Sequence, residues 1–261
     1  MFKFFICLIS LTFCSLNSIT VQAAEWNEVK GDHFIVYYKA DENFAKEVER
    51  NAEIYYNRIA ADLGYPRYSN FWQWENRVKI YIHASEDEFQ KMTGQPGWSH
   101  GMASYTKKEI HSFHSEENFM QTLLPHEITH LVFRDFVGIE GEIPLWLDEG
   151  VAEWEEPEKR AIAKEVMKEF LKEERKFRLH DLTQIDIRNV KIELAVKLFY
   201  VQSVSVVDFL ISKYGADDFI AFCRQLRDEK TLDEALQFTY PDTVRNLNEL
   251  EEQWLKYISE A

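Results

Sequence analysis

The chain has 261 residues, 46% of them hydrophobic, which is enough to build a sizeable core in one large domain or in one domain with a helical extension. Its 45 acidic residues outnumber its 30 basic residues, so the formal net charge is −15 at pH 7. A surface this acidic argues against nucleic acid or an anionic membrane as a partner, because both carry negative charge.

The N-terminus has the pattern of a secretory signal. Lys3 supplies a positive charge, residues 4–16 are almost wholly apolar, and Val21-Gln22-Ala23 places small residues at the −3 and −1 positions of a cleavage site. We therefore expect residues 1–23 to be removed and the protein to be secreted or periplasmic; an uncleaved N-terminal anchor is the alternative. Cleavage would leave 29 basic and 45 acidic residues and a net charge of −16. We expect no later stretch to be long and apolar enough to span a bilayer, and so no stable membrane insertion after cleavage.

Strands and helices alternate in the first half of the expected mature chain. Strands are predicted where β-branched and aromatic residues cluster, at 33–39 and 78–83, and two short extended segments are predicted within 102–113. Apolar residues recur at helical spacing over 42–63, and a capping pattern at Ser85 predicts the start of a short helix. These elements indicate a small sheet accompanied by helices.

From Glu116 onward the pattern is almost entirely helical. Pro125 lies within the first of these helices and removes a backbone donor, so that helix should kink or restart there. The predicted fold class is therefore α+β, with a small mixed N-terminal sheet over about 24–138 and a mainly helical part over about 139–261, together one domain. The predicted helices cover residues 119–136, a segment beginning at Pro144, and 158–177, 190–214, 216–227, 231–238 and 244–258.

The segment His126-Glu127-Ile128-Thr129-His130 has the pattern HExxH. Two histidines four residues apart on a helix point the same way, about one turn from each other, so both imidazoles can reach one metal ion. A catalytic zinc takes three such nitrogen or oxygen ligands and keeps a fourth position open. Glu127, next to the first histidine, is placed to take a proton from a water molecule at that position. The pattern predicts metal-assisted hydrolysis, most simply of a peptide bond.

A third ligand is available on the next predicted helix. Glu149 lies in the segment WLDEG, and 18 residues separate it from His130. A carboxylate brought back from this second helix would complete the ligand set of His126, His130 and Glu149. The alternative is a helix pair with incidental histidines and acids, but buried charges of that kind are costly without a metal or partners.

The two segments LPHEITHLVF and WLDEGVAEWEE resemble the gluzincin metallopeptidases, and more closely the bacterial peptidase MA-like domains. The motif match covers about residues 120–155, and a looser resemblance in the order of elements covers most of the mature chain. The resemblance implies zinc as the cofactor, His126, His130 and Glu149 as its ligands, and Glu127 as the general base. It also implies a zincin-like fold, with the third ligand in the helical part, and a peptide or protein substrate.

Two further roles have competing candidates. Gluzincins use a carboxylate to hold a ligand histidine, and both Glu153 and Asp148 are candidates. Glu153 could equally be an exposed acid, because the charge-rich stretch 153–178 is most simply a solvated helix face. Tyr200 resembles the tyrosine that aminopeptidase-like gluzincins use as a donor to the oxyanion, and His180 is the alternative. An ordinary aromatic residue on an amphipathic helix would also explain Tyr200.

In zincins the substrate lies along a sheet edge that precedes the motif helix, which corresponds here to residues 101–113. Aminopeptidases of this group carry an acid on that edge that binds the free amine of the substrate. This chain has Gly101-Met102-Ala103-Ser104 there, without an acid, which favours an endopeptidase. The competing hypothesis is a non-catalytic zinc-binding interaction domain that kept the fold, and the presence of Glu127 favours catalysis over it.

Overall fold

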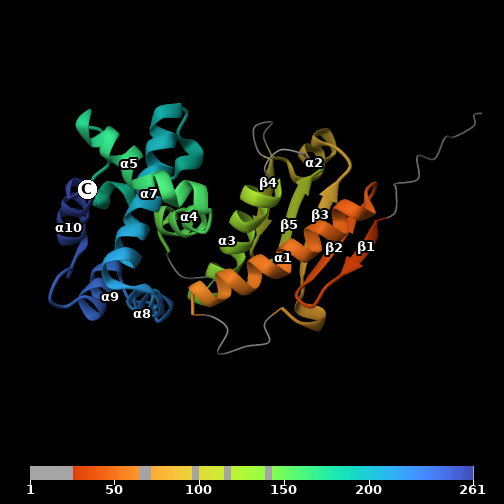
Figure 1. Ribbon diagram of the computed structural model, residues 1–261, viewed down its shortest axis with the longest axis horizontal. Helices are drawn as coiled ribbons and strands as arrows, with labels where there is room; N and C mark the ends of the chain where they lie inside the picture. The colour runs from red at the N-terminus through yellow and green to blue at the C-terminus, as the bar shows by residue number, and fades with distance from the viewer. Residues whose placement is uncertain (1–25, 65–71, 96–99, 115–118, 139–142, 261) are drawn as a thin grey trace, which may run out of the picture.

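The computed structural model describes residues 26–64, 72–95, 100–114, 119–138 and 143–260. The predicted signal and its cleavage site, residues 1–23, lie outside this part of the chain. The described residues form a sheet-containing lobe, which holds the strands with the helices up to residue 137, and a lobe built of helices from residue 145 onward (Figure 1). The α+β fold class predicted from the sequence is confirmed.

Five strands form one mixed sheet in which the outer pairs are antiparallel and the inner pairs are parallel. The second, third and fifth strands of the chain therefore run parallel in the middle of the sheet. The fourth strand lies at an edge of the sheet, within the stretch 101–113 where an edge was expected, whereas the fifth strand, in the same stretch, is interior. In spatial order the strands are β1 (Asn27–Lys30), β2 (Phe34–Tyr38), β3 (Val78–His83), β5 (Glu109–Phe113) and β4 (Gly101–Ser104).

One face of the sheet is covered by two long helices, α1 (Glu42–Asp62) and α3 (Leu124–Val137) (Figure 1). Apolar residues alternate along the strands toward these helices, and Val36, Ile80 and Ile110 are completely buried. A π-helical segment, η2 (Phe119–Leu123), precedes α3, so the predicted restart near Pro125 is confirmed. Such π-helical turns occur often beside functional sites.

The other face of the sheet carries a row of side chains in register across all five strands. Tyr81 of β3 lies opposite Tyr37 of β2 and His111 of β5, and the row ends with Glu28 of β1 and Met102 of β4. The rings of Tyr37 and Tyr81 stack with centroids 5.0 Å apart, and those of Tyr81 and His111 stack at 4.7 Å. Cross-strand aromatic pairs of this kind stabilise the pairing of the strands.

The helical lobe is arranged around one long helix, α7 (Glu193–Tyr214) (Figure 1). Against it pack α4 (Leu145–Trp154), which follows α3 in the chain, and α5 (Pro157–Lys172). The remaining helices of this lobe are α6 (Leu179–Leu182), η3 (Ile187–Asn189), α8 (Ala216–Arg227), α9 (Leu232–Thr239) and α10 (Leu247–Ser259); η1 (Trp74–Asn76) and α2 (Glu86–Thr93) belong to the sheet lobe.

Helix α7 corrects one expectation from the sequence. It is long and apolar enough to span a bilayer by length and composition, although no stretch after the signal was expected to be. More than half of its most apolar 18-residue window, 56%, is buried inside the protein, which is the pattern of a core helix. Gly150 allows α4 to approach it closely, because a Cβ added there would lie 2.7 Å from the backbone oxygen of Ser203.

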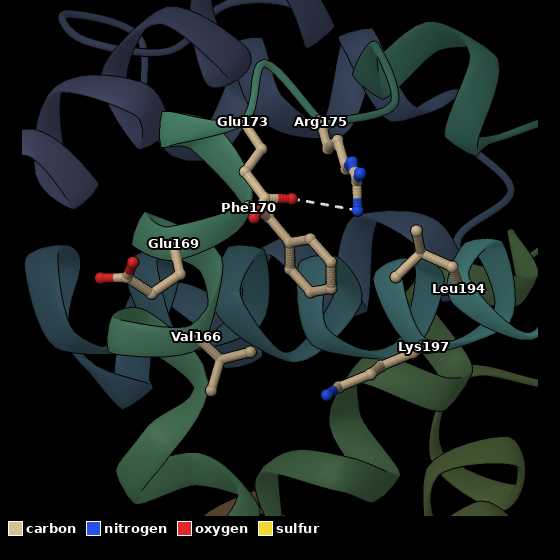
Figure 2. A pocket seen from close by; sticks show the side chains of 7 residues that line it. All are labelled: Val166, Glu169, Phe170, Glu173, Arg175, Leu194 and Lys197. Carbon is tan, nitrogen blue, oxygen red and sulfur yellow. Dashed lines mark ion pairs between the residues drawn. The ribbon is translucent and has the colours of Figure 1, made fainter.

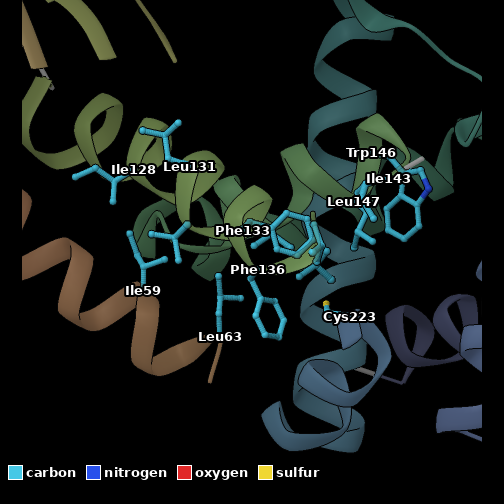
Figure 3. Packing of buried hydrophobic residues seen from close by; sticks show 14 of the residues in the cluster. Ile59, Leu63, Ile128, Leu131, Phe133, Phe136, Ile143, Trp146, Leu147 and Cys223 are labelled. Atoms are coloured by element: carbon cyan, nitrogen blue, oxygen red, sulfur yellow. The ribbon is translucent and has the colours of Figure 1, made fainter. Parts of the chain in front are cut away.

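A continuous apolar core joins the two lobes. Side chains of α1 and α3, such as Ile59 and Phe133, belong to the same buried cluster as Trp146 of α4 and Cys223 of α8 (Figure 3). Trp146 and Phe133 are completely buried. Burial of an aromatic side chain of this size contributes about 2–3 kcal/mol, so the shared cluster stabilises the contact between the lobes.

Several helix ends differ from the predicted ones for local reasons. The helix predicted over 158–177 ends at Lys172, and Glu174, two residues later, adopts a positive φ of 56° that is incompatible with continuing it. The predicted helix over 244–258 begins at Leu247, because Asn246 caps it by accepting a hydrogen bond from the Glu249 backbone. The predicted start of a helix at Ser85 is confirmed by the same kind of cap.

Candidate metal centre

Helix α3 places His126 and His130 one turn apart, and α4 brings Glu149 against them. The two Nε2 atoms lie 3.1 Å apart. Oε2 of Glu149 lies 3.6 Å from Nε2 of His126 and 3.7 Å from Nε2 of His130. The three side chains predicted as ligands therefore converge on one point from two helices.

The size of this triangle suits a zinc ion. With ligand atoms at about 2.0–2.1 Å from zinc and a tetrahedral arrangement, neighbouring ligand atoms lie about 3.3 Å apart. The observed edges of 3.1, 3.6 and 3.7 Å bracket that value. Two imidazoles and a carboxylate are also the donor set that zinc takes in hydrolases.

A carboxylate holds the outer nitrogen of His126. Nδ1 of His126 lies 2.9 Å from Oε1 of Glu156, which is buried with 3% of its surface exposed. A carboxylate oxygen accepts, so this contact places a proton on Nδ1 and directs Nε2 toward Glu149. Burial opposes the charged imidazole, but hydrogen bonds to Glu149 and Glu156 raise the pKa of His126 to about 10.

Asp148 does the same for His130. Its Oδ1 lies 3.1 Å from Nδ1 of His130, while its Oδ2 accepts hydrogen bonds from Arg134 at 3.0 Å and from the Tyr105 hydroxyl at 3.3 Å. Only 1% of Asp148 is exposed. Although burial opposes its charge, His130 and Arg134 lower the pKa of Asp148, so it stays a carboxylate and fixes the orientation of the ring.

Glu127 is the one motif acid that is not part of the triangle. It is 8% exposed, and burial raises its pKa, while the neighbouring His126 and His130 moderate the increase. The backbone N–H of Ala103, on the edge strand β4, donates a hydrogen bond to it. A carboxyl group with a raised pKa, beside a cluster of metal-binding type, is equipped to take up and return a proton.

A family model described as the peptidase MA superfamily matches residues 70–260, which is nearly three quarters of the chain and contains the whole centre. The chain belongs to the peptidase MA superfamily. Among curated proteins, none matches the chain. Membership indicates a peptidase-like domain that acts on peptides or proteins.

The two candidate oxyanion donors of this peptidase-like domain lie in different places. Tyr200 is half-buried on α7, and burial, followed by the charges of Glu149 and Glu153, raises the pKa of its hydroxyl, which is therefore a donor at neutral pH. His180 has a side chain that is 73% exposed and lies 3.8 Å from Asp181. The structure brings Tyr200 toward the centre and leaves His180 at the surface.

Glu153, the other acid weighed for holding a histidine, is buried but bonds a lysine instead. Lys159 donates to Glu153 at 2.6 Å and to Glu156 at 2.9 Å. Glu153, Glu156 and His126 could by position hold a second metal, but the Lys159 ammonium already neutralises the two acids. The expectation that the charge-rich segment 153–178 is a solvated helix face is wrong at its start, because Glu153, Glu155 and Glu156 are all buried.

The candidate centre also includes three residues that the motifs in the sequence did not single out. Glu156 follows the end of α4 and stands at the N-terminus of α5, so no helical spacing relates it to His126. Tyr105 lies in the turn after β4 and meets Asp148 only through the fold. Arg134 had a usable signal, since it lies four residues after His130 on the same helix and therefore on the same face.

Proposed function

We propose that this peptidase MA-superfamily protein is an exported zinc-dependent metallopeptidase that hydrolyses peptide bonds. The observation that carries the proposal is the convergence of His126, His130 and Glu149, with edges of 3.1–3.7 Å, beside the buried carboxyl group of Glu127. In this proposal the first three residues hold the zinc. A zinc ion held there would activate water at neutral pH and polarise a substrate carbonyl.

Glu127 would act as the general base and then as the general acid. It would take the proton of the attacking water and deliver it to the amine that leaves when the peptide bond breaks. Burial raises its pKa and thereby strengthens it as a proton acceptor, while the Ala103 N–H fixes one of its oxygens. Glu156 and Asp148 would keep the two histidine rings in the orientation that presents Nε2 to the metal.

Tyr200 would donate a hydrogen bond to the oxyanion that forms when water adds to the carbonyl. Its hydroxyl keeps its proton at neutral pH because burial and the nearby acids raise its pKa. A donor aimed at developing negative charge in a half-buried site is typically worth about 10²–10³-fold in rate. Tyr105 is less suited to this role, because its hydroxyl already donates to Asp148.

The substrate backbone would pair with β4, the strand at the sheet edge beside Glu127. The strand Gly101–Ser104 carries no acidic side chain that could bind a free amino terminus. This supports internal cleavage of a polypeptide rather than removal of its first residue.

The decisive experiment combines zinc content with hydrolysis. Purified protein should bind about one zinc per chain and cleave an unstructured protein such as casein, and a chelator should abolish the cleavage. Glu127→Gln should keep the zinc and the melting temperature but lose about 10³-fold in rate, because only the proton transfer is removed. A Glu127→Gln enzyme as active as the wild type would disprove the mechanism.

Zinc binding without hydrolysis in either protein would instead favour the non-catalytic interaction domain. Export makes a separate prediction, since the mature protein should begin at Ala24 when the full chain is expressed in a bacterium and recovered from outside the cytoplasm.

A further inference from the structure

A pocket opens beside the candidate metal centre, between helices α5 and α7. It has a volume of about 470 Å³, and Glu153 and Tyr200 line the end that faces the centre. The carboxylate of Glu153 lies within 4.8 Å of the ligand atoms of His126 and Glu156. The rest of the lining is mostly aliphatic, with Val201 and Val204 from α7 and Ile162, Ala163 and Val166 from α5.

A second hollow continues the first along the same two helices. It measures about 260 Å³, and Val166 and Lys197 line both hollows. Figure 2 shows Phe170 at its centre, with Leu194 and Lys197 of α7 facing Val166 of α5. From Lys159 to Glu173 the groove follows α5 for about 21 Å at 1.5 Å per residue. An extended polypeptide covers that length in about six residues.

Large apolar side chains of this groove are open to solvent beside its charged residues. Ile162 is 58% exposed and Leu194 is 42% exposed, and both belong to the small set of large apolar side chains that the described part of the chain leaves open to solvent. Ile192, two residues before Leu194, is 68% exposed. Apolar side chains gathered along a groove that leads to a reaction centre indicate a ligand that covers them.

Among the residues that the structure describes, one cation of the groove has no ionic partner. Each carboxylate that lines it has its own cation: Glu153 has Lys159 at 2.6 Å, Glu169 has Lys172 at 2.6 Å, and Glu173 has Arg175 at 3.0 Å. Lys197 is exposed and forms no ion pair within the described part of the chain. In a protein with a net charge of −15, an unmatched lysine between two apolar hollows is suited to a carboxylate from a ligand.

We propose that the α5–α7 groove is the binding site for an extended segment of the substrate, and that it selects a large apolar side chain followed by a carboxylate. The apolar side chain would fill the 470 Å³ pocket next to Tyr200, and the carboxylate would pair with Lys197, one helical turn away on α7. The proposal rests on the proposed peptidase function, because it assigns the substrate class of that centre. The carboxylate can belong to an acidic side chain or to the C-terminus of a peptide.

The test uses binding and cleavage in parallel, so that it does not depend on catalysis. Binding is measured by fluorescence anisotropy on the zinc-loaded Glu127→Gln protein, and cleavage is measured on the wild-type enzyme. The probes are alanine-based decapeptides that carry one leucine or phenylalanine, with glutamate, glutamine or lysine one to three residues away. Glutamate should be preferred to glutamine by about fivefold and to lysine by about tenfold.

Lys197→Glu is the decisive variant, and Lys213→Glu is its matched control. Both lysines are exposed on α7, but Lys213 lies about 24 Å further along the helix and lines neither hollow. Lys197→Glu should reverse the preference from glutamate to lysine, whereas Lys213→Glu should leave it unchanged. An unchanged preference in Lys197→Glu, or the same shift in both variants, would overturn the proposal.

The apolar half of the proposal has its own variant. Ile162→Ser removes an exposed apolar wall without disturbing the core and should weaken the binding of the leucine and phenylalanine peptides about threefold to tenfold. Binding of an all-alanine peptide should not change. Equal losses for all peptides would show that Ile162 does not line the site of the apolar side chain.

Two further probes separate the sources of the carboxylate. One peptide ends in a free carboxylate after its leucine, and the other is the same peptide with an amidated C-terminus. If amidation weakens binding more than the Glu-to-Gln change does, Lys197 pairs with the C-terminal carboxylate of the peptide. If the Glu-to-Gln change weakens binding more, Lys197 pairs with an acidic side chain. If the wild type cleaves no peptide but binding still depends on peptide charge, the peptidase proposal is wrong and the groove proposal is supported. If the wild type cleaves peptides without any preference for charge, only the groove proposal is wrong.

Discussion

The two lobes differ in how they contribute to the centre. The sheet lobe supplies His126, Glu127 and His130 from five consecutive positions of one helix, which lies on a sheet fixed by paired strands. The helical lobe supplies Glu149 and Glu156 from two different helices, together with Tyr200 from a third. The sheet lobe therefore offers a rigid local motif, whereas the helical lobe offers groups that come together only when its helices pack.

Because of this difference, most of the residues proposed for catalysis and the residues proposed for substrate recognition lie on different helices. The groups proposed to move protons and to hold two thirds of the ligand set belong to α3, next to the edge of the sheet. The groups proposed to contact substrate side chains belong to α5 and α7. A change in the α5–α7 pair can therefore alter the substrate while leaving the motif helix as it is.

Removing the helical lobe's ligand should have the largest effect. Glu149→Ala leaves both histidines and should lower zinc affinity by about 1,000-fold or more, because zinc then keeps only two protein ligands. Competition with a chromophoric chelator measures this affinity. His130→Ala, from the sheet lobe, should produce a loss of similar size. If Glu149→Ala binds zinc as tightly as the wild type, the helical lobe does not complete the ligand set.

A change that loosens the packing of the helical lobe should have the next largest effect. A Cβ at position 150 would lie 2.7 Å from the Ser203 backbone oxygen, so Gly150→Val must push α4 away from α7. We expect the free energy of unfolding to fall by about 2–3 kcal/mol, measured by urea denaturation. Ala161→Val, at an exposed position of α5, is the control and should change it by less than about 0.5 kcal/mol. Equal effects would mean that the close contact of α4 and α7 does not matter.

Weakening the support of one ligand should have a smaller effect. Glu156→Gln keeps an acceptor near Nδ1 of His126 but removes its charge, and zinc affinity should fall by about 10–100-fold. Glu158→Gln, an exposed change two residues later, should leave the affinity unchanged. A matching loss in both variants would point to net charge rather than to the contact with His126.

The last effect concerns pH and the seam between the lobes. Glu155 lies 3.2 Å from Arg58 of α1, and burial, followed by the charge of Asp62, raises its pKa to about 7. An acid whose pKa is higher in the folded than in the unfolded state binds more protons when folded, so it stabilises at low pH and its contribution is lost as pH rises. Stability should therefore decline between about pH 4.5 and pH 7, by about 1–3 kcal/mol. Glu155→Gln should flatten this part of the pH profile of unfolding; an unchanged profile would contradict the assignment.

The parts of the site that could be predicted are those with a local signature. His126, Glu127 and His130 are related by the repeat of one helix, and the WLDEG segment indicated Glu149 because a resemblance supplied its context. Strands β2 and β3 were also predictable, since they are short runs of β-branched and aromatic residues. Strand β1, Asn27–Lys30, lacks such a run and was not predicted. Asp148 was one of two weighed candidates because it adjoins Glu149 in sequence.

The other parts of the site depend on how the helices pack against one another, and the periodicity of a sequence does not predict this packing. Glu156 reaches His126 because the chain turns between α4 and α5, and the groove exists because α5 and α7 lie side by side. The acids at 153–156 have the composition of a solvated surface, but all three are buried, Glu153 and Glu156 beside Lys159 and Glu155 beside Arg58. The sequence pattern of α7 indicated an ordinary amphipathic helix, and only the packing of neighbouring helices such as α4 and α5 shows that it is a largely buried core helix.

The row of stacked side chains on the far face of the sheet has a consequence for the reaction centre. Faces alternate along a strand, so a slip of one residue in pairing would exchange every side chain between the two faces. Tyr81 and His111, held in the row, penalise such a slip between β3 and β5, and Met102 extends the penalty to β4. The same register sets which backbone N–H of β4 reaches Glu127, and here it is that of Ala103. Aromatic stacking on the surface remote from the centre thus helps to align β4 with the proposed proton acceptor, and we expect mutations there to change the acidity of Glu127.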